Sequence, residues 1–503
     1  MNAPRHAVLV AAGMVGTLLT GAAAFSGASD ALVQLQLGQL LYKQGQFLPA
    51  IHAFEQAVSS DDLAVRVPAR SGLARAAMRV GDFVRSRREA EALKVDAPGN
   101  AFALAVHGES MWAGGLFDEA EASYRDALLV DPDEAWARNG LAVVLAARGR
   151  FTEALEHAQA AVRSDPGEAE YHHTLGNVYE DVRRYEPAAQ SLANFINLLP
   201  AGARDDRAVW ARAELRFLRS FGSRVPYDFQ SDPNQVYVLP FEEVNEKIIV
   251  RGKVNGEEMD LVVDTGAELA VVSAQTAQRK GIDPVTYTVS AGVGSVGLRG
   301  LQLARVDRLE LGALKVRNVP VIIKNPPLRD LPAPEAESVS PLTFGLSMRV
   351  DYRAKRITLA RRLPPEEGDS HVVLPLWMHR LATVRGLVDG TLAASFVVDT
   401  GGQVISISTT TAQSLQHPQT GRRIGLKVYG TSGWDPDAYL MPGVSLAFDD
   451  IRFDKASVVV LNLRAPSVLL GYELGGIVGH QFLSRYRVTF DLANSELRLG
   501  RAS

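Results

Sequence analysis

Two aspartates stand at matching places in two similar stretches of this 503-residue chain. Asp264 and Asp399 each follow a Val-Val pair and each precede Thr-Gly. Two carboxyl groups within a few ångströms of one another cannot both ionise, so they share one proton. The ionised member can then take a proton from water while the protonated member polarises a carbonyl group. The pair predicts hydrolysis of a peptide bond, with Asp264 and Asp399 as the catalytic residues and no need for a metal or cofactor.

The Thr and Gly of each motif have separate expected roles in the active-site loops. The hydroxyl groups of Thr265 and Thr400 can form hydrogen bonds across a pseudo-twofold axis. Gly266 and Gly401 allow backbone N–H groups to approach the carboxylates. If the motif occurred only once, the alternative to a catalytic role would be an ordinary Asp at a turn, whose side chain is hydrogen-bonded within its own loop.

Duplication of the surrounding sequence favours the paired site. Residues 262–278 match residues 397–413 at nine of 17 positions, with a constant offset of 135. In both stretches a β-branched run, a turn with Asn-Gly or Asp-Gly, and a second apolar run precede the motif, which indicates a β-hairpin. We therefore expect two tandem β lobes, at residues 237–363 and 371–503.

At these motifs the sequence resembles the retropepsin-like aspartic peptidases, in the bacterial form with two Asp-Thr-Gly units in one chain. The resemblance covers about 237–503 and implies two closed β-barrel lobes, each giving one Asp at their interface. In that family a later strand braces the Asp loop with two apolar residues and a Gly, here Ile477-Val478-Gly479. The first lobe departs from this pattern, because only Phe344-Gly345 stands at that place.

Three interpretations of the β region stay open at this stage. The first is an exported aspartic endopeptidase that acts on peptides or proteins. The second is a catalytically inactive descendant that binds peptide or serves as a scaffold, which the departure in the first lobe would allow. In the third, each β unit pairs with its twin in another chain.

Glycine-rich hairpins in both lobes are candidates for flaps that close over substrate. Gly292 and Gly294 lie in such a hairpin of the first lobe, and Tyr429 and Trp434 lie in the corresponding part of the second. An ordinary Gly-rich turn would have the same sequence pattern. We take these four residues as candidate flap and substrate-binding positions.

The residue after each Asp-Thr-Gly motif bears on the pH at which the pair would work. Ala267 and Gly402 occupy these positions, and neither side chain can donate a hydrogen bond to the ionised Asp. Such a donor would favour the charged form and lower the pKa of the pair. We therefore expect activity at mildly acidic to neutral pH.

The first half of the chain has a 34-residue period. Prolines recur at this interval: Pro98, Pro132, Pro166 and Pro200. A proline ends the second helix of a hairpin, and small residues at the same interval let two helices approach closely. The segments resemble tetratricopeptide repeats, which predicts an α-solenoid of five repeats at 29–200 with a capping helix at 201–222. Such an array offers a concave surface to a protein partner; a spacer or an oligomerisation arm is the alternative.

A polar segment at 223–236 is expected to be the linker between the array and the β lobes. Few contacts should cross such a segment. The β region from about Tyr237 should then cleave short peptides without the repeats.

The N-terminus and the composition bear on the compartment and on the partners. Residues 7–29 are uncharged and apolar, so residues 1–28 predict a signal peptide or, alternatively, an uncleaved membrane anchor. Either predicts export to the periplasm or the medium. The absence of Cys excludes disulfides and thiolate sites, and the net charge of −4 gives no basic field for nucleic acid.

Overall fold

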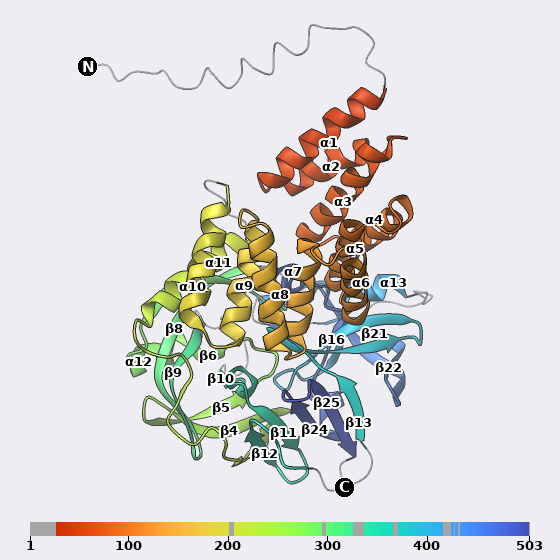
Figure 1. Ribbon diagram of the computed structural model, residues 1–503. Helices are drawn as coiled ribbons and strands as arrows, with labels where there is room; N and C mark the ends of the chain where they lie inside the picture. Colours follow the sequence, from red (N-terminus) through yellow and green to blue (C-terminus); the bar gives the residue numbers. More distant parts are fainter. Residues whose placement is uncertain are drawn as a thin grey trace, which may run out of the picture.

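The computed structural model describes residues 27–200, 206–293, 298–324, 337–365, 371–415, 424–426, 428–430 and 433–501. Helices form the N-terminal part and strands the C-terminal part (Figure 1). Residues 1–26 of the predicted signal peptide or anchor lie outside the described residues. Within the described ranges, no helix is both long and apolar enough to cross a membrane.

Within residues 27–200 and 206–220, the N-terminal part consists of five helical hairpins and one further helix. The hairpins are α1 (Gly27–Lys43) with α2 (Phe47–Val58), α3 (Leu63–Arg79) with α4 (Phe83–Asp96), α5 (Ala101–Ala113) with α6 (Phe117–Val130), α7 (Ala135–Ala147) with α8 (Phe151–Ser164), and α9 (Ala169–Asp181) with α10 (Tyr185–Leu198). Helix α11 (Asp206–Ser220) follows them. The predicted α-solenoid is confirmed.

Close helix packing explains why small residues recur with the repeat. Gly108 on α5 and Gly140 on α7 both face the ring of Tyr124 on α6, which is buried between them. A Cβ atom at Gly108 would lie 2.8 Å from that ring, and one at Gly140 would lie 2.1 Å from it. Neither position can carry a side chain without moving the helices apart.

Each β lobe contains a closed ring of six strands. In the first lobe the ring runs β4 (Lys247–Val254), β5 (Glu257–Val263), β10 (Glu337–Val339), β6 (Ala270–Ser273), β9 (Leu314–Lys324) and β8 (Leu298–Leu311), which pairs again with β4. In the second lobe it runs β15 (Leu381–Val388), β16 (Leu392–Val398), β23 (Gly476–Val478), β17 (Ile405–Ser408), β22 (Ile451–Leu461) and β21 (Tyr439–Phe448), which pairs again with β15. The two predicted closed barrels are confirmed.

Additional strands extend both rings. In the first lobe β7 (Pro284–Ala291) pairs with β8, β1 (Asp228–Phe229) with β9, and β3 (Glu242–Val244) with β4. In the second lobe β14 (Trp377–His379) pairs with β15, and β18 (Ile424–Gly425) pairs with β21. A short helix follows β6 and another follows β17: α12 (Ala274–Lys280) and α13 (Thr409–Ser414).

A third sheet joins the lobes. Its strand order is β13 (His371–Pro375), β25 (Glu496–Arg501), β24 (Tyr486–Asp491), β11 (Ser347–Asp351), β12 (Arg356–Ala360) and β2 (Tyr237–Pro240). The central pair is β11 from the first lobe against β24 from the second, with Val350 opposite Val488. One hydrophobic core extends through both lobes, so the lobes are held in a fixed relation by burial as well as by backbone pairing.

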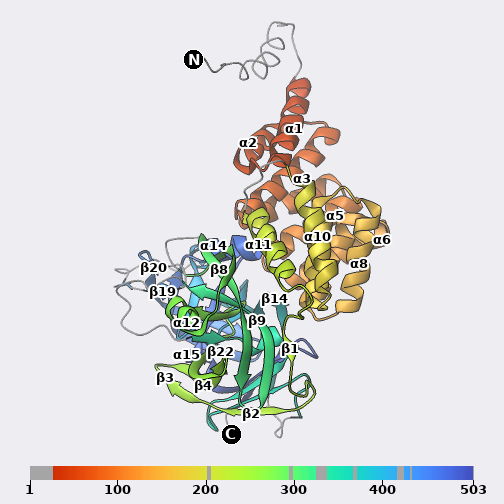
Figure 2. The ribbon, with the colours of Figure 1, turned by 90° about the vertical axis from the view of Figure 1, so that its left-hand side faces the viewer.

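The helical array packs against both β lobes. Helix α11 lies over the first lobe, and α5 and α6 lie over the second (Figures 1 and 2). At the second lobe, the ring of Phe117 lies 5.1 Å from that of Trp377 and 5.1 Å from that of Tyr472, measured between centroids. At the first lobe, Arg183 donates a hydrogen bond of 2.5 Å to the carbonyl oxygen of Phe344. The prediction that few contacts cross between the array and the lobes is therefore wrong.

The segment expected to be a linker also differs from the prediction. Within residues 223–236, β1 pairs with β9, and Gln230 N–H donates to the carbonyl oxygen of Lys315 at 2.9 Å. The Asn318 side chain donates to the carbonyl oxygen of Val225 at 3.0 Å. The Lys315 N–H also donates to Oγ of Ser231 at 3.1 Å, so a segment whose polar composition indicated a linker is held by hydrogen bonds to the first lobe.

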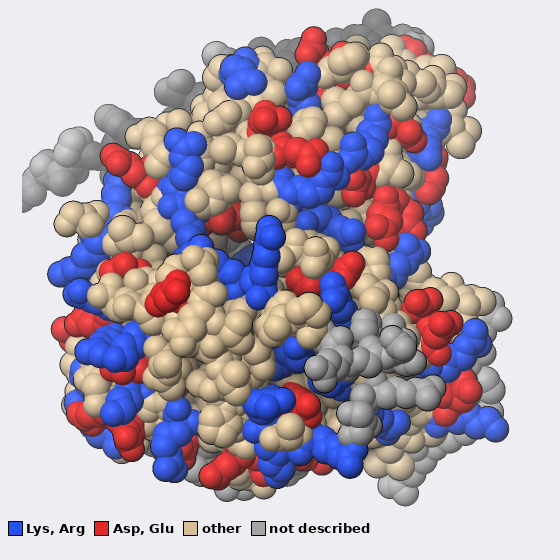
Figure 3. Space-filling view, turned by 60° about the horizontal axis from the view of Figure 1, so that its bottom comes forward, with Lys and Arg blue, Asp and Glu red and all other residues tan. Residues whose placement is uncertain are grey.

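Charged side chains of both signs share the surface. Figure 3 shows Lys and Arg side chains interspersed with Asp and Glu side chains over one face of the described residues. The whole chain has 53 basic and 57 acidic residues, which agrees with this mixed distribution. Mixed charges of this kind largely cancel one another at a distance, so this face does not present a strong field of one sign.

Candidate active site

The two Asp-Thr-Gly motifs meet at the interface between the lobes. Each follows a central strand of its barrel, β5 or β16, and each Asp backbone is held by a neighbouring strand. The Asp264 N–H donates to the carbonyl oxygen of Val339, and the Asp399 N–H donates to that of Val478, both at 3.0 Å. The two loops are thus positioned alike, and they come from one chain. This arrangement contradicts the interpretation in which each unit pairs with a twin from another chain.

The two threonines lock the loops together across the interface. The Thr265 N–H donates to Oγ1 of Thr400 at 3.1 Å, and the Thr400 N–H donates to Oγ1 of Thr265 at 3.0 Å. Each hydroxyl then donates across the interface: Thr265 to the Val398 carbonyl oxygen at 2.6 Å, and Thr400 to that of Val263 at 2.7 Å. Both threonines are almost fully buried. This is the pseudo-twofold arrangement expected from the sequence.

The glycines of the motifs are required by the carboxyl group of the opposite lobe. The Gly266 N–H donates to Oδ1 of Asp264 at 3.0 Å, and the Gly401 N–H donates to Oδ1 of Asp399 at 2.8 Å. A Cβ atom at Gly266 would lie 2.5 Å from Cγ of Asp399, and one at Gly401 would lie 2.6 Å from Cγ of Asp264. Each carboxyl group therefore lies directly against the loop that carries the other one.

Burial raises the pKa of both carboxyl groups, and the charge of Asp264 raises that of Asp399 further. For Asp399, burial and then the charge of Asp264 raise the pKa to about 7, although the backbone N–H groups of Gly401 and Gly402 donate to its carboxylate. For Asp264, burial raises the pKa, opposed first by the positive charge of Lys324. The pKa of each carboxyl group therefore lies above that of an ordinary Asp.

Ala267 and Gly402 differ in the space available beside the pair. A Cβ atom at Gly402 would lie 2.7 Å from Oδ2 of Asp399, so this position cannot take a side chain without displacing the carboxyl group. Ala267 already carries a Cβ atom. Only at Ala267 can a hydroxyl group be added by a small substitution.

The second lobe braces its Asp loop in the way the sequence predicts. Strand β23, which contains Ile477 and Val478, lies between β16 and β17. A Cβ atom at Gly479 would lie 2.6 Å from the carbonyl oxygen of Gly402, and the N–H of His480 donates to that oxygen at 2.8 Å. Gly479 is thus needed for the close approach of the two segments.

The first lobe braces its Asp loop with a different segment from the one predicted. Strand β10 takes the place of β23, because it pairs with both β5 and β6 and ends at Val339. Ser340 stands where the second lobe has Gly479. Phe344 and Gly345 instead form the end of a 3₁₀ helix (Pro341–Phe344) and its cap, where Gly345 adopts a left-handed conformation. The assignment of the brace to Phe344-Gly345 is wrong.

The candidate flaps are described only in part. Strands β7 and β8 form a long hairpin in the first lobe, and Gly292 follows β7. Gly294 lies outside the described residues. In the second lobe, β19 (Val428–Gly430) pairs with β20 (Gly433–Asp435), with Tyr429 opposite Trp434 in the backbone register. The side chains of these two aromatic residues lie outside what the structure describes.

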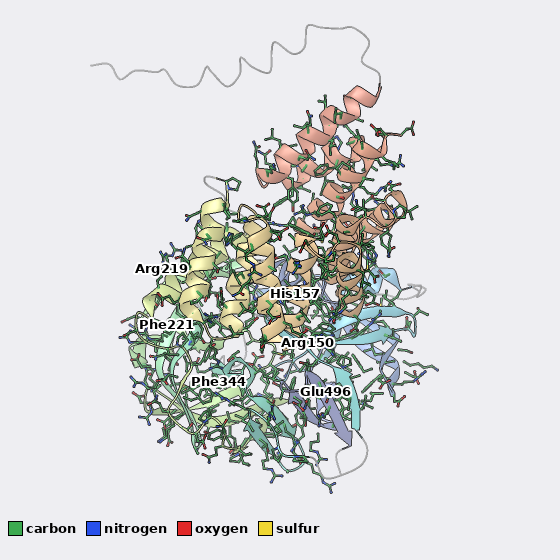
Figure 4. The ribbon with its side chains drawn as sticks, viewed as in Figure 1. Arg150, His157, Arg219, Phe221, Phe344 and Glu496 are labelled. Carbon is green, nitrogen blue, oxygen red and sulfur yellow. The ribbon has the colours of Figure 1, made fainter. Side chains whose placement is uncertain are left out.

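Helix α11 of the array contacts the first lobe at the hairpin of β7 and β8. Phe217 and Phe221 are buried against Leu303 of β8, with Leu269 of the active-site loop packed beside them. Figure 4 shows Phe221 at the end of α11 that meets the first lobe. This contact places the array next to the candidate flap and to the loop that carries Asp264.

An ion pair that the sequence did not indicate also connects the lobes beside the active-site loop. Arg380, at the turn after β14, donates to Oε2 of Glu268 through Nε at 3.0 Å and through Nη2 at 2.6 Å. Its guanidinium lies 5.6 Å from the centre of the Trp210 ring on α11. A single Arg and a single Glu 112 residues apart give no pattern from which the pair could be predicted.

Three known protein families match parts of the chain. Residues 250–331 match the family described as gag-polyprotein putative aspartyl protease, and residues 384–474 match the aspartyl protease family. Residues 35–101 and 106–169 match the tetratricopeptide repeat family. The chain thus carries tetratricopeptide repeats followed by two retropepsin-like aspartyl protease domains.

Individual relatives match the helical array. The TPR repeat-containing thioredoxin TTL4 of Arabidopsis thaliana is 35% identical over 85 residues, which is 17% of this chain and 12% of that protein. The crystal structure of TTC0263, a thermophilic TPR protein of Thermus thermophilus, is 22% identical and covers 37% of this chain and 98% of its own, with a TM-score of 0.32. YrrB, described as a TPR protein with an unusual peptide-binding site, is 20% identical over 34% of this chain and 88% of its own, with a TM-score of 0.23.

Proposed function

We propose that this protein is an exported aspartic endopeptidase in which Asp264 and Asp399 form a single catalytic pair. The observation that supports this most strongly is the placement of the two carboxyl groups at the interface between the lobes. Each lies against the glycine of the opposite motif, and reciprocal threonine hydrogen bonds hold the two loops together. No purely structural role requires two like charges to be placed together in a buried site, because such a pair opposes folding.

The difference between the two environments assigns the proton in this mechanism. We assign the shared proton to Asp399, because the negative charge of Asp264 favours its protonated form, and we take Asp264 as the ionised member, because the positive charge of Lys324 favours its charged form. Asp264 takes a proton from a water molecule, whose oxygen attacks the scissile carbonyl carbon while Asp399 protonates the carbonyl oxygen. The tetrahedral diol then breaks its C–N bond as Asp264 gives its proton to the leaving nitrogen. A hydroxyl proton of the diol returns to Asp399, so both residues regain their starting states.

The test is peptide cleavage by single amide variants. Asp264→Asn and Asp399→Asn should each lose turnover, because each removes either the base or the acid while the side-chain shape is kept. Asp450→Asn, at an exposed turn of the second lobe, is the matched control and should keep wild-type turnover. Wild-type turnover in either dyad variant would refute the mechanism. Peptide binding without turnover in the wild type would instead support the inactive peptide-binding alternative.

We further propose that the helical array binds protein substrates or partners. The first helices of successive hairpins contact one another and form a shared face, where Nη1 of Arg79 on α3 lies 3.6 Å from Oε1 of Glu170 on α9 although the two belong to non-adjacent hairpins. If this face receives protein, Arg79→Ala should raise the KM for a protein substrate and leave that for a short peptide unchanged. An equal change for both substrates would contradict the recruiting role.

The proposed export rests on the apolar N-terminal sequence. N-terminal sequencing of the mature protein from the periplasmic or extracellular fraction should find a chain that begins near residue 29. Recovery of the intact chain in the membrane fraction would identify the N-terminal segment as an anchor, and an intact chain in the cytoplasm would contradict export.

A further inference from the structure

In the second lobe, Gly479 lets the bracing strand approach the Asp loop closely. The first lobe has Ser340 at that place, so its bracing strand β10 must be fixed by another contact. This strand has only three residues, Glu337–Val339. It nevertheless supplies the carbonyl oxygen of Val339 to the N–H of Asp264. A strand this short gains little from its own backbone pairing and needs an additional anchor.

The carboxylate of Glu337 provides that anchor. The N–H of Ser273 donates to its Oε2 at 2.6 Å, and the hydroxyl of Ser273 donates to its Oε1 at 2.9 Å. The hydroxyl of Thr276 also donates to Oε1. Three donors from the start of α12 therefore converge on one carboxylate, and hydrogen bonds to a charged acceptor are stronger than those between neutral groups.

The second lobe makes the corresponding contacts with a backbone carbonyl group. There the N–H of Ser408 donates to the carbonyl oxygen of Gly475 at 2.8 Å, and the hydroxyl of Thr411 donates to it at 3.0 Å. Ser408 and Thr411 are the counterparts of Ser273 and Thr276 at the offset of 135. The same two donor positions are thus satisfied by a side chain in one lobe and by the main chain in the other.

Strand registers show why the two lobes differ. Val339 pairs with Val263 as Val478 pairs with Val398, so Glu337 takes the place of Gly476. A Cβ atom at Gly476 would lie 2.2 Å from the carbonyl oxygen of Ser406, which excludes any side chain there. The first lobe accommodates a Glu at this place and directs its carboxylate to the neighbouring helix.

We propose that Glu337 is a positioning residue for Asp264: its carboxylate fixes β10 to the start of α12 and thereby holds the backbone of the catalytic loop. The inference rests on the proposed peptidase function for its kinetic consequence. Its structural consequence is that the Asp264 N–H is protected from hydrogen exchange with solvent. This consequence can be measured whether or not the protein turns over a peptide.

Amide hydrogen exchange of the full-length protein tests the structural consequence. In Glu337→Gln, which keeps the shape but replaces one acceptor oxygen with an NH₂ group, the Asp264 amide should exchange about 10-fold faster or more. The Asp399 amide of the same molecule should be unchanged. The reciprocal variant Thr411→Val should leave the Asp264 amide unchanged and affect only the second lobe. Unaltered exchange at Asp264 in Glu337→Gln, or equally increased exchange at both aspartates, would overturn the proposal.

Turnover of the same variants tests the kinetic consequence. Glu337→Gln should lower kcat about 10-fold with little change in KM, because it moves a catalytic group and not a substrate contact. Glu258→Gln, at an exposed position of the same lobe, removes an equal charge and should change neither constant. A rise in KM at constant kcat would refute the positioning role. A wild type without turnover would count against the peptidase assignment only, since the exchange measurement still decides the role of Glu337.

Discussion

Replacing Asp399 with Asn should stabilise the protein at pH 8 and leave its stability nearly unchanged at pH 4. Asp399 has a pKa of about 7 in the folded protein, against 3.8 for an ordinary Asp. The folded state therefore binds a proton that the unfolded state releases near pH 4. As a consequence, the wild type loses stability as the pH rises from about 4 to about 7. The Asn variant carries no ionisable group at this position and should not show that loss.

The size of the effect follows from the difference in pKa. Each pKa unit corresponds to about 1.36 kcal/mol. The rise of the Asp399 pKa to about 7 therefore lowers the free energy of unfolding of the wild type by at most about 4 kcal/mol above pH 7. The Asn side chain also loses the repulsion from Asp264 and keeps the acceptor for the N–H of Gly401. For a β region of this size, a gain of a few kcal/mol would raise the Tm by roughly 5–10 °C.

The assay is thermal unfolding of the wild type and the variant at pH 4, 6 and 8. The Tm difference should be near zero at pH 4 and should grow through pH 6 to pH 8. Asp450→Asn, which changes an exposed carboxyl group, controls for the loss of one charge. An equal Tm difference at all three pH values, or a less stable variant at pH 8, would refute the argument that the pair is strained by like charge.

Three further predictions concern the surroundings of the pair. Ala267→Ser adds a hydroxyl donor beside Asp264 and should move the acidic limb of the pH–rate profile down by about one to two pH units; an unmoved limb would contradict this. Thr265→Val removes two buried hydrogen bonds between the lobes and should lower both kcat and the free energy of unfolding, the latter by about 2–5 kcal/mol; wild-type stability would show that the bonds do not hold the lobes. Phe117→Ala opens the aromatic contact between the array and the second lobe and should cost about 3–5 kcal/mol in denaturant unfolding, whereas a cost below about 1 kcal/mol would contradict the integral packing of the array.

The pairing of the two Asp-Thr-Gly motifs could be predicted because its signal is local and occurs twice. Asp264 and Asp399 lie within short motifs whose offset is constant, and the strands that carry them follow directly from apolar runs and turn residues. The threonine contacts follow from the same symmetry. No contact between distant segments had to be known in order to place these residues together.

The brace of the first lobe could not be predicted because the offset is not constant beyond the motif. Val339 and Val478 are equivalent in the fold but differ by 139 positions, while the motifs differ by 135. A proline-rich stretch before residue 337 hides the shift, and Glu337 looks like an exposed residue in sequence. Its role depends on donors from another segment, which no pattern within the strand reveals.

The packing of the array on the lobes was missed for a related reason. Trp112 and Phe117 have the appearance of ordinary core residues of a helical repeat. Their rings also contact Tyr472 and Trp377, which lie more than 250 positions later in the chain. Hydrophobic periodicity shows that a residue is buried but not which part of the chain buries it.

The claim that one chain supplies both halves of one catalytic pair is tested most directly by mixing two inactive variants. Peptide cleavage would be measured for the wild type, for Asp264→Asn, for Asp399→Asn, and for an equimolar mixture of the two variants. We expect turnover in the wild type and none in either variant or in their mixture, because every chain in the mixture carries one damaged pair. Restored turnover in the mixture would show that intact pairs form between chains, and full turnover in either variant alone would show that the pair is not the catalytic group.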